Sequence, residues 1–141
     1  MAEIIQVNIR SESGFCSYDE AYKDKLVIKK NSIKYKYDPV VVTETNPVRE
    51  WSYKTNSSIY SKIFIDISNE VNIILDTVKD LRCCDGSMLS FEIIFDDKTK
   101  KKQAYWGSIH NFDPCLKMIQ KLVPNSEYIP ICLLTENDYE E

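Results

Sequence analysis

The segment that most constrains the fold of this chain is a long amphipathic stretch that begins at Tyr60. Its apolar residues recur every three or four positions as far as Val78, which places them on one face of an α-helix. Ser57 or Ser58 can cap the first amides of this helix, and Gly86 suits the turn that follows it. A helix with one apolar face must bury that face, so the rest of the sequence has to supply a second layer.

Strands are predicted on both sides of this helix, because apolar and polar residues alternate there. In the first strand Ile5, Val7 and Ile9 share one side, whereas residues 11–24 have no clear period and predict a loop. The predicted strands cover residues 3–10, the two arms of a hairpin at 25–38, residues 50–54, the two arms of a hairpin at 89–106, and residues 128–134.

A shorter helix is predicted from near Asp113 to Pro124. The element order is then roughly βββ(β)α-ββα(β), which indicates an α+β fold. We expect an antiparallel sheet with one long and one shorter helix packed on one face. Residues 1–135 should form a single α+β domain, and residues 136–141 a mobile acidic tail.

Glycine and histidine are too scarce for most catalytic and cofactor sites. The 141 residues include three glycines and one histidine, His110. Loops that hold phosphate need several glycines close together, and zinc hydrolase sites draw on several histidines. We therefore predict no cofactor, no metal centre and no enzyme activity, and expect a small module that acts through its surface.

The five cysteines leave one alternative open, a thiol-based enzyme or redox sensor. Cys115 falls in the first turn of the shorter predicted helix, where the helix dipole lowers a thiol pKa, and His110 precedes it by five residues. The adjacent pair Cys83-Cys84 is the other candidate. Neither arrangement matches the C-x2-C pairs of common structural zinc sites, and buried free thiols are the simpler interpretation.

Charge and hydropathy restrict the location and the partners. The formal net charge of −4 disfavours broad binding to nucleic acid, although it is compatible with a local basic patch. No segment approaches the ~20 apolar residues of a membrane span, and residues 1–10 do not resemble a signal peptide. We expect a cytoplasmic protein without membrane contact, and the sequence leaves open whether it forms a homo-oligomer.

Two groups of residues are candidates for contact with a partner protein. Asp66, Glu70 and Asp76 lie on the polar side of the long predicted helix, where they could dock on a basic surface of a nucleic-acid-binding effector or a toxin. Aromatic residues of the predicted strands could share an exposed sheet face, and aromatic residues are enriched at protein interfaces. The aromatic candidates are Trp51, Tyr53 and Trp106.

A nucleic-acid-binding module is the alternative function. Four lysines gather at the tip of the second predicted hairpin, where they could contact phosphates while sheet aromatics stack on bases. These lysines are Lys98, Lys100, Lys101 and Lys102. Direct binding of nucleic acid is the less favoured function, because the cluster is small and the chain as a whole is acidic.

The small size, the acidity and the lack of catalytic motifs are similar to those of small inhibitors made by phages and mobile elements, such as anti-CRISPR proteins, and of immunity proteins that neutralise toxins. This similarity covers no motif, so no functional residue carries over from it. It implies a non-enzymatic inhibitor that occupies a site on another macromolecule by protein–protein contact, and that is the function we expect.

Overall fold

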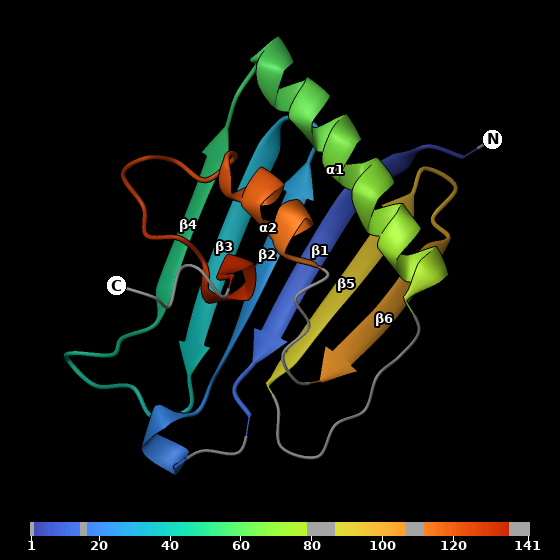
Figure 1. Ribbon diagram of the computed structural model, residues 1–141. Coiled ribbons are helices and arrows are strands. Elements are labelled where there is room, and N and C mark those ends of the chain that lie inside the picture. The colour runs from blue at the N-terminus through green and yellow to red at the C-terminus, as the bar shows by residue number, and fades with distance from the viewer. Residues whose placement is uncertain (1, 15–16, 79–86, 107–111, 136–141) are drawn as a thin grey trace.

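The computed structural model describes residues 2–14, 17–78, 87–106 and 112–135 (Figure 1). The predicted acidic tail, residues 136–141, and the predicted stop at Gly86 lie outside this part of the chain. In chain order the elements are β1 (Ile4–Glu12), η1 (Tyr18–Glu20), β2 (Tyr22–Lys29), β3 (Ser32–Pro39), β4 (Arg49–Lys54), α1 (Ser58–Thr77), β5 (Met88–Phe95), β6 (Lys100–Trp106), α2 (Asp113–Gln120) and η3 (Ile131–Leu133).

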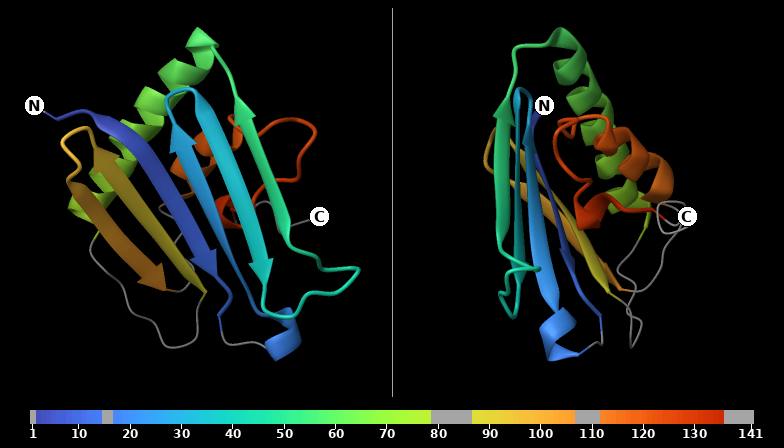
Figure 2. Two further views of the ribbon diagram at one scale, coloured as in Figure 1. Left: turned by 180° about the vertical axis from the view of Figure 1, so that it is seen from behind. Right: turned by 90° about the vertical axis from the view of Figure 1, so that its left-hand side faces the viewer.

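The strands form one antiparallel sheet in the order β4-β3-β2-β1-β5-β6. β1 to β4 make a meander, after which α1 crosses the sheet diagonally and brings the chain to β5 on the other side of β1 (Figure 1). Seen edge-on, α1 and α2 cover one face, and no described element covers the other (Figure 2). The predicted α+β fold, with both helices on one face of an antiparallel sheet, is therefore confirmed.

The core lies between the covered face of the sheet and the two helices. Phe64, Ile67 and Val71 of α1 pack on the sheet, and Leu116 and Ile119 of α2 join them. Each such side chain stabilises the fold by about 1.5–3 kcal/mol when fully buried. The strand residues with no exposed surface are Val7, Ile9, Leu26, Ile28, Phe91, Ile93 and Tyr105.

The start of β1 departs from the predicted alternation. The pairing of β1 with β5 slips between Ile4 and Gln6, which inserts Ile5 as an extra residue. Ile5 is consequently 45% exposed, and Ile4 packs against the core in its place. The prediction that Ile5 shares the buried side of Val7 and Ile9 was wrong.

Residues 128–134 do not form the short edge strand that the sequence predicts. Pro130 has no amide hydrogen to donate, and the next residues form the 3-10 helix η3 instead. The side-chain Nε2 of Gln120 in α2 donates to the Leu133 carbonyl at 2.8 Å, and the backbone amide of Cys132 donates to the Asp24 carboxylate rather than to a strand. The conformation of this segment is therefore determined by contacts with residues distant in sequence, above all with Asp24.

A buried carboxylate, that of Asp24 in β2, holds this C-terminal segment against the sheet. Asp24 is 4% exposed. It accepts hydrogen bonds from the amide and the hydroxyl of Ser11 in β1, from the Tyr35 hydroxyl in β3 at 2.7 Å, and from the Cys132 amide at 3.0 Å. Burial raises the pKa of Asp24, although all these hydrogen bonds act in the opposite direction. One side chain thus joins three strands to η3.

Asp24→Asn should destabilise the fold by roughly 2–4 kcal/mol, because an amide accepts at only one of its two polar atoms and leaves buried donors unpaired. The raised pKa of Asp24 means that the folded state binds a proton more readily than the unfolded chain. The stability owed to Asp24 is therefore greatest below the unfolded pKa and falls as the pH rises through the folded pKa.

Urea denaturation of both proteins from about pH 4 to about pH 8 measures this dependence. The difference in free energy of unfolding between wild type and Asp24→Asn should narrow as the pH rises, and a widening difference would contradict the account. Asp19→Asn, which alters an exposed carboxylate in η1, is the control and should leave the stability unchanged.

Candidate functional site

The carboxylates predicted as an acidic docking face all lie on α1, and one of them is engaged within the fold. Asp66 and Glu70 are exposed to solvent. Asp76 is paired with Lys101 of β6, with 2.9 Å between its Oδ1 and the lysine Nζ, and the same Nζ donates to Asn72 Oδ1 at 2.9 Å. Asp76 therefore ties the end of α1 to the sheet edge.

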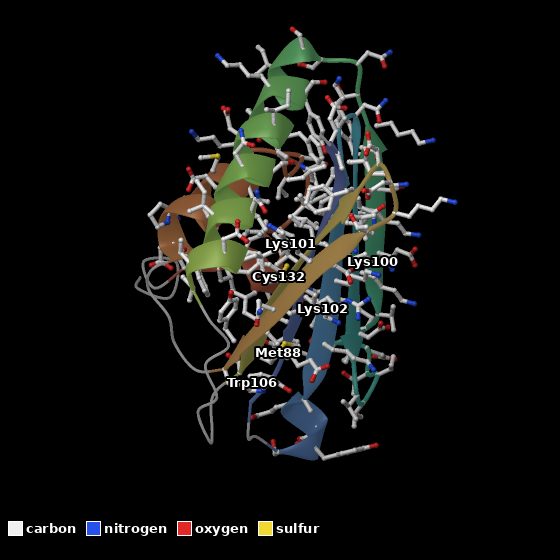
Figure 3. All side chains as sticks on the ribbon, turned by 90° about the vertical axis from the view of Figure 1, so that its right-hand side faces the viewer. Met88, Lys100, Lys101, Lys102, Trp106 and Cys132 are labelled. Atoms are coloured by element: carbon white, nitrogen blue, oxygen red, sulfur yellow. The ribbon has the colours of Figure 1, made fainter. Side chains whose placement is uncertain are left out.

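The structure divides the four lysines that the sequence places at one hairpin tip. Lys98 lies in the turn with a φ of 71°. Because β6 begins at Lys100, its residues alternate between the two faces: Lys100 and Lys102 point to the uncovered face, and Lys101 points to α1 (Figure 3). The four lysines therefore lie at the hairpin tip as predicted, but Lys101 does not share a surface with Lys100 and Lys102.

The three aromatic candidates do not share a face either. Trp51 and Tyr53 of β4 belong to the face that the helices cover, and the Trp51 ring lies 5.8 Å from that of Tyr35. Trp106 is at the opposite edge of the sheet, where it pairs with Met88 and points to the uncovered face (Figure 3). An aromatic platform made of all three is therefore excluded.

The thiols in the described part of the chain are buried and unactivated. Cys115 lies in the first turn of α2 as predicted, but its pKa is raised rather than lowered: burial raises it to about 12, with a further contribution from Glu70. Burial also raises the pKa of Cys132, and the Asp24 carboxylate acts in the same direction. The other residues of the thiol hypothesis, Cys83, Cys84 and His110, lie outside the described residues.

Cys115 and Cys132 should resist alkylation by iodoacetamide in the native protein and react fully in denaturant, because the thiolate is the nucleophile and neither thiol forms it near neutral pH. Mass spectrometry of the digested protein reports each cysteine separately. Rapid labelling of either residue under native conditions would contradict the predicted protection.

A surface beside β4 gathers exposed apolar side chains, and the sequence revealed only part of it. Trp51 and Tyr53 were candidates, whereas residues 128–129 were assigned to a strand, so their exposure was missed. We call this region the β4-edge surface. It consists of Val48, Arg49, Trp51, Tyr53, Ile59, Tyr128 and Ile129.

The larger hollow of the β4-edge surface, about 490 Å³, lies between the outer strands and the loop that precedes η3. Trp51 and Tyr37 line its wall, and the Arg49 guanidinium lies over the Tyr37 ring, 5.9 Å from its centroid. On the loop side stand Tyr128, which is 86% exposed, and Ile129, which is 41% exposed. Aromatic rings, three aliphatic side chains, an arginine and two glutamates therefore surround one open depression.

A second hollow of about 370 Å³ lies between the end of β4, the start of α1 and the end of α2. Tyr53, 49% exposed, and Ile59, 71% exposed, stand at it. Because residues 124–125 line this hollow and residues 127–129 line the larger one, the loop between α2 and η3 borders both. The β4-edge surface is thus one region with two depressions.

The uncovered face of the sheet, which we call the open face, is basic although the chain is acidic. Cross-strand register directs nine basic and four acidic side chains to it, a net charge of +5 on a chain whose formal charge is −4. The basic residues are Arg10, Lys23, Lys25, Lys29, Lys34, Lys36, Lys54, Lys100 and Lys102.

Three of these cations lie directly opposite one another. Arg10 pairs with Lys25, and Lys25 pairs with Lys36, across β1, β2 and β3. Like charges in such positions destabilise a sheet. Partial burial and the neighbouring Arg10 lower the pKa of Lys25, while Glu92 acts in the opposite direction. A shallow hollow of about 410 Å³ lies among these side chains.

Lys25→Glu should stabilise the fold by about 0.5 kcal/mol, because it converts two repulsive cross-strand neighbours into attractive pairs. Thermal denaturation at low ionic strength should give a higher Tm than wild type, and the gain should shrink in about 1 M salt. Lys62→Glu on the exposed side of α1 makes the same charge change as a control. A Tm at or below that of wild type would refute the repulsion.

Comparison with known proteins adds no assignment to these surfaces. No protein-family model matches the sequence, and no curated protein matches it. Among the described residues, no helix is long and apolar enough to cross a membrane. The function is therefore argued from the surfaces themselves.

Proposed function

We propose that this chain is a non-enzymatic binding protein and that its β4-edge surface contacts a partner protein. The observation that carries the proposal is the exposure of Tyr128, 86%, beside Trp51 and Arg49 at the rim of a hollow. A large aromatic side chain left in water has its apolar area available for burial in a complex, and such patches mark interaction sites.

The residue types on this surface support a protein as the partner. Tryptophan, tyrosine and arginine dominate the energetics of protein interfaces, where they surround pockets that take an anchor side chain. Trp51, Arg49 and Tyr128 supply all three types at the larger hollow. We infer that the partner inserts an aromatic or aliphatic side chain there and carries a carboxylate close by for Arg49.

The position of β4 supports an extended partner segment. Within the described sheet β4 pairs with β3 alone, so its outer edge offers backbone amides and carbonyls to a further strand. A segment that added to this edge would place alternate side chains toward the covered face, where Trp51 and Tyr53 border the two hollows. The partner segment would then be held both by backbone hydrogen bonds to β4 and by burial of its side chains in the hollows.

An inhibitory role, as expected from size and composition, is compatible with this mode of contact. A protein that covers a site on a toxin or a defence effector needs a complementary surface and no catalytic group. The raised pKa of Cys115 and of Cys132 is consistent with that role.

Tyr128→Ala combined with Ile129→Asp should abolish capture of the partner when tagged protein is incubated with nuclease-treated lysate of source cells. Both side chains are exposed, so circular dichroism and Tm should stay close to wild type. Tyr18→Ala combined with Ile73→Asp makes the same chemical changes at positions 73% and 53% exposed in η1 and α1, and should keep the partner.

Quantitative mass spectrometry of the captured proteins decides the outcome. A partner that binds wild type and the control but not the β4-edge variant supports the proposal. If the β4-edge variant and the control variant capture the same proteins in equal amounts, the proposal is refuted. Asp66→Lys combined with Glu70→Lys tests the acidic side of α1 in the same assay, and loss of the partner in that variant alone would move the contact to the helix.

A further inference from the structure

We propose that the open face is a second binding surface, distinct from the β4-edge surface, and that its ligand is the phosphodiester backbone of a nucleic acid. The two surfaces use different side chains, because residues that alternate along each strand point to opposite faces of the sheet. The inference therefore does not rest on the proposed protein contact and goes beyond it.

The charge on the open face is largely uncompensated. Three of its four acidic residues have partners within the sheet: Asp38 lies 4.0 Å from Lys36, Glu50 lies 3.4 Å from Lys34, and Glu92 accepts a hydrogen bond from Asn8 at 2.7 Å. The basic residues that form no ion pair with other described residues are Arg10, Lys23, Lys25, Lys29, Lys54, Lys100 and Lys102.

The centre of the open face has the form of an anion site. Arg10, Lys25 and Lys36 stand in register at a hollow of about 410 Å³. Two more cations line it, Lys23 and Lys34, so its five cations outnumber the three carboxylates in its lining, which are Glu12, Asp24 and Asp38. An anion seated among these cations would replace their mutual repulsion with attraction. A fold that keeps three like charges in direct opposition loses stability in the free state, and binding would recover it.

The polar side chains between the cations favour nucleic acid over a lipid surface. Phosphate and sugar contacts come mainly from Arg and Lys, with Ser, Asn and Gln beside them, and this is the composition of the open face. The neutral polar residues directed to it with accessible surface are Gln6, Ser32 and Ser52, whereas Asn8 and Ser90 are buried beneath the longer side chains. Amphipathic membrane binding would instead require a row of large apolar side chains.

The open face should bind the backbone rather than read the bases. Among the described strands Trp106 is the one aromatic residue directed to it, and Trp106 lies at the β6 edge, so a stacking platform is lacking. Binding should therefore be insensitive to sequence and strongly dependent on salt. The screening length of ~8 Å at physiological ionic strength limits the repulsion from acidic residues behind the sheet.

Fluorescence anisotropy with short labelled RNA and DNA, single-stranded and duplex, tests the proposal. The full-length protein should bind at about 50 mM salt and lose at least roughly tenfold in affinity at about 200 mM. Lys25→Glu combined with Lys36→Glu should weaken binding at low salt by at least roughly tenfold. The control, Lys62→Glu combined with Lys121→Glu, makes the same charge change on the helix side and should bind like wild type.

Each other outcome would overturn the proposal. Absence of binding at low salt, or equal losses in the two double variants, would show that the arrangement of charge on the open face is not recognised. Binding to phosphatidylserine vesicles without binding to nucleic acid would assign the face to a membrane.

Tyr128→Ala combined with Ile129→Asp should leave nucleic-acid affinity unchanged, which separates this test from that of the protein contact.

Discussion

The burial of the Asp24 carboxylate is the interaction on which both surfaces depend. Through the Cys132 amide it holds η3 against β1, β2 and β3, and the loop before η3 carries Tyr128 to the β4 edge. The same orientation of β2 that turns Asp24 inward turns its neighbours Lys23 and Lys25 outward. The pairing register of β2 therefore determines both the attachment of η3 to the sheet through Asp24 and the position of the cations at the centre of the open face.

This coupling makes the register of β2 unusually well determined. A shift by one residue would exchange the two faces and bury Lys23 and Lys25 in place of Asp24 and Leu26. Buried lysines without partners cost far more than the cross-strand repulsion among Arg10, Lys25 and Lys36 on the open face. The fold can therefore carry opposed like charges on its outer face, because the inner face alone decides how the strands align.

Local periodicity was sufficient to predict the helices, most strands and the α+β class, since a period of two or 3.6 residues needs no distant contact. The errors arose where distant contacts prevail. A bulge in the pairing of β1 with β5 exposes Ile5. Contact with Asp24 holds residues 131–133 as η3 instead of a strand. Burial by the rest of the fold raises the pKa of Cys115, where its helix position predicted a lowered pKa. The open face as a whole was not predicted for the same reason. Local alternation places the lysines of the β2–β3 hairpin on one side, but the strand order that adds Arg10, Lys100 and Lys102 to them depends on distant pairing.

The placement of the two surfaces has a consequence for how partners would be engaged together. The β4-edge surface lies on the covered side and the outer edge of the sheet, and the open face points away from the helices. A nucleic acid on the open face would not occlude Tyr128 or the hollows beside β4. A partner protein that is itself bound to nucleic acid would then be held at two points. Attachment at one raises the effective concentration for the other, so two modest contacts would give tight binding without a large interface.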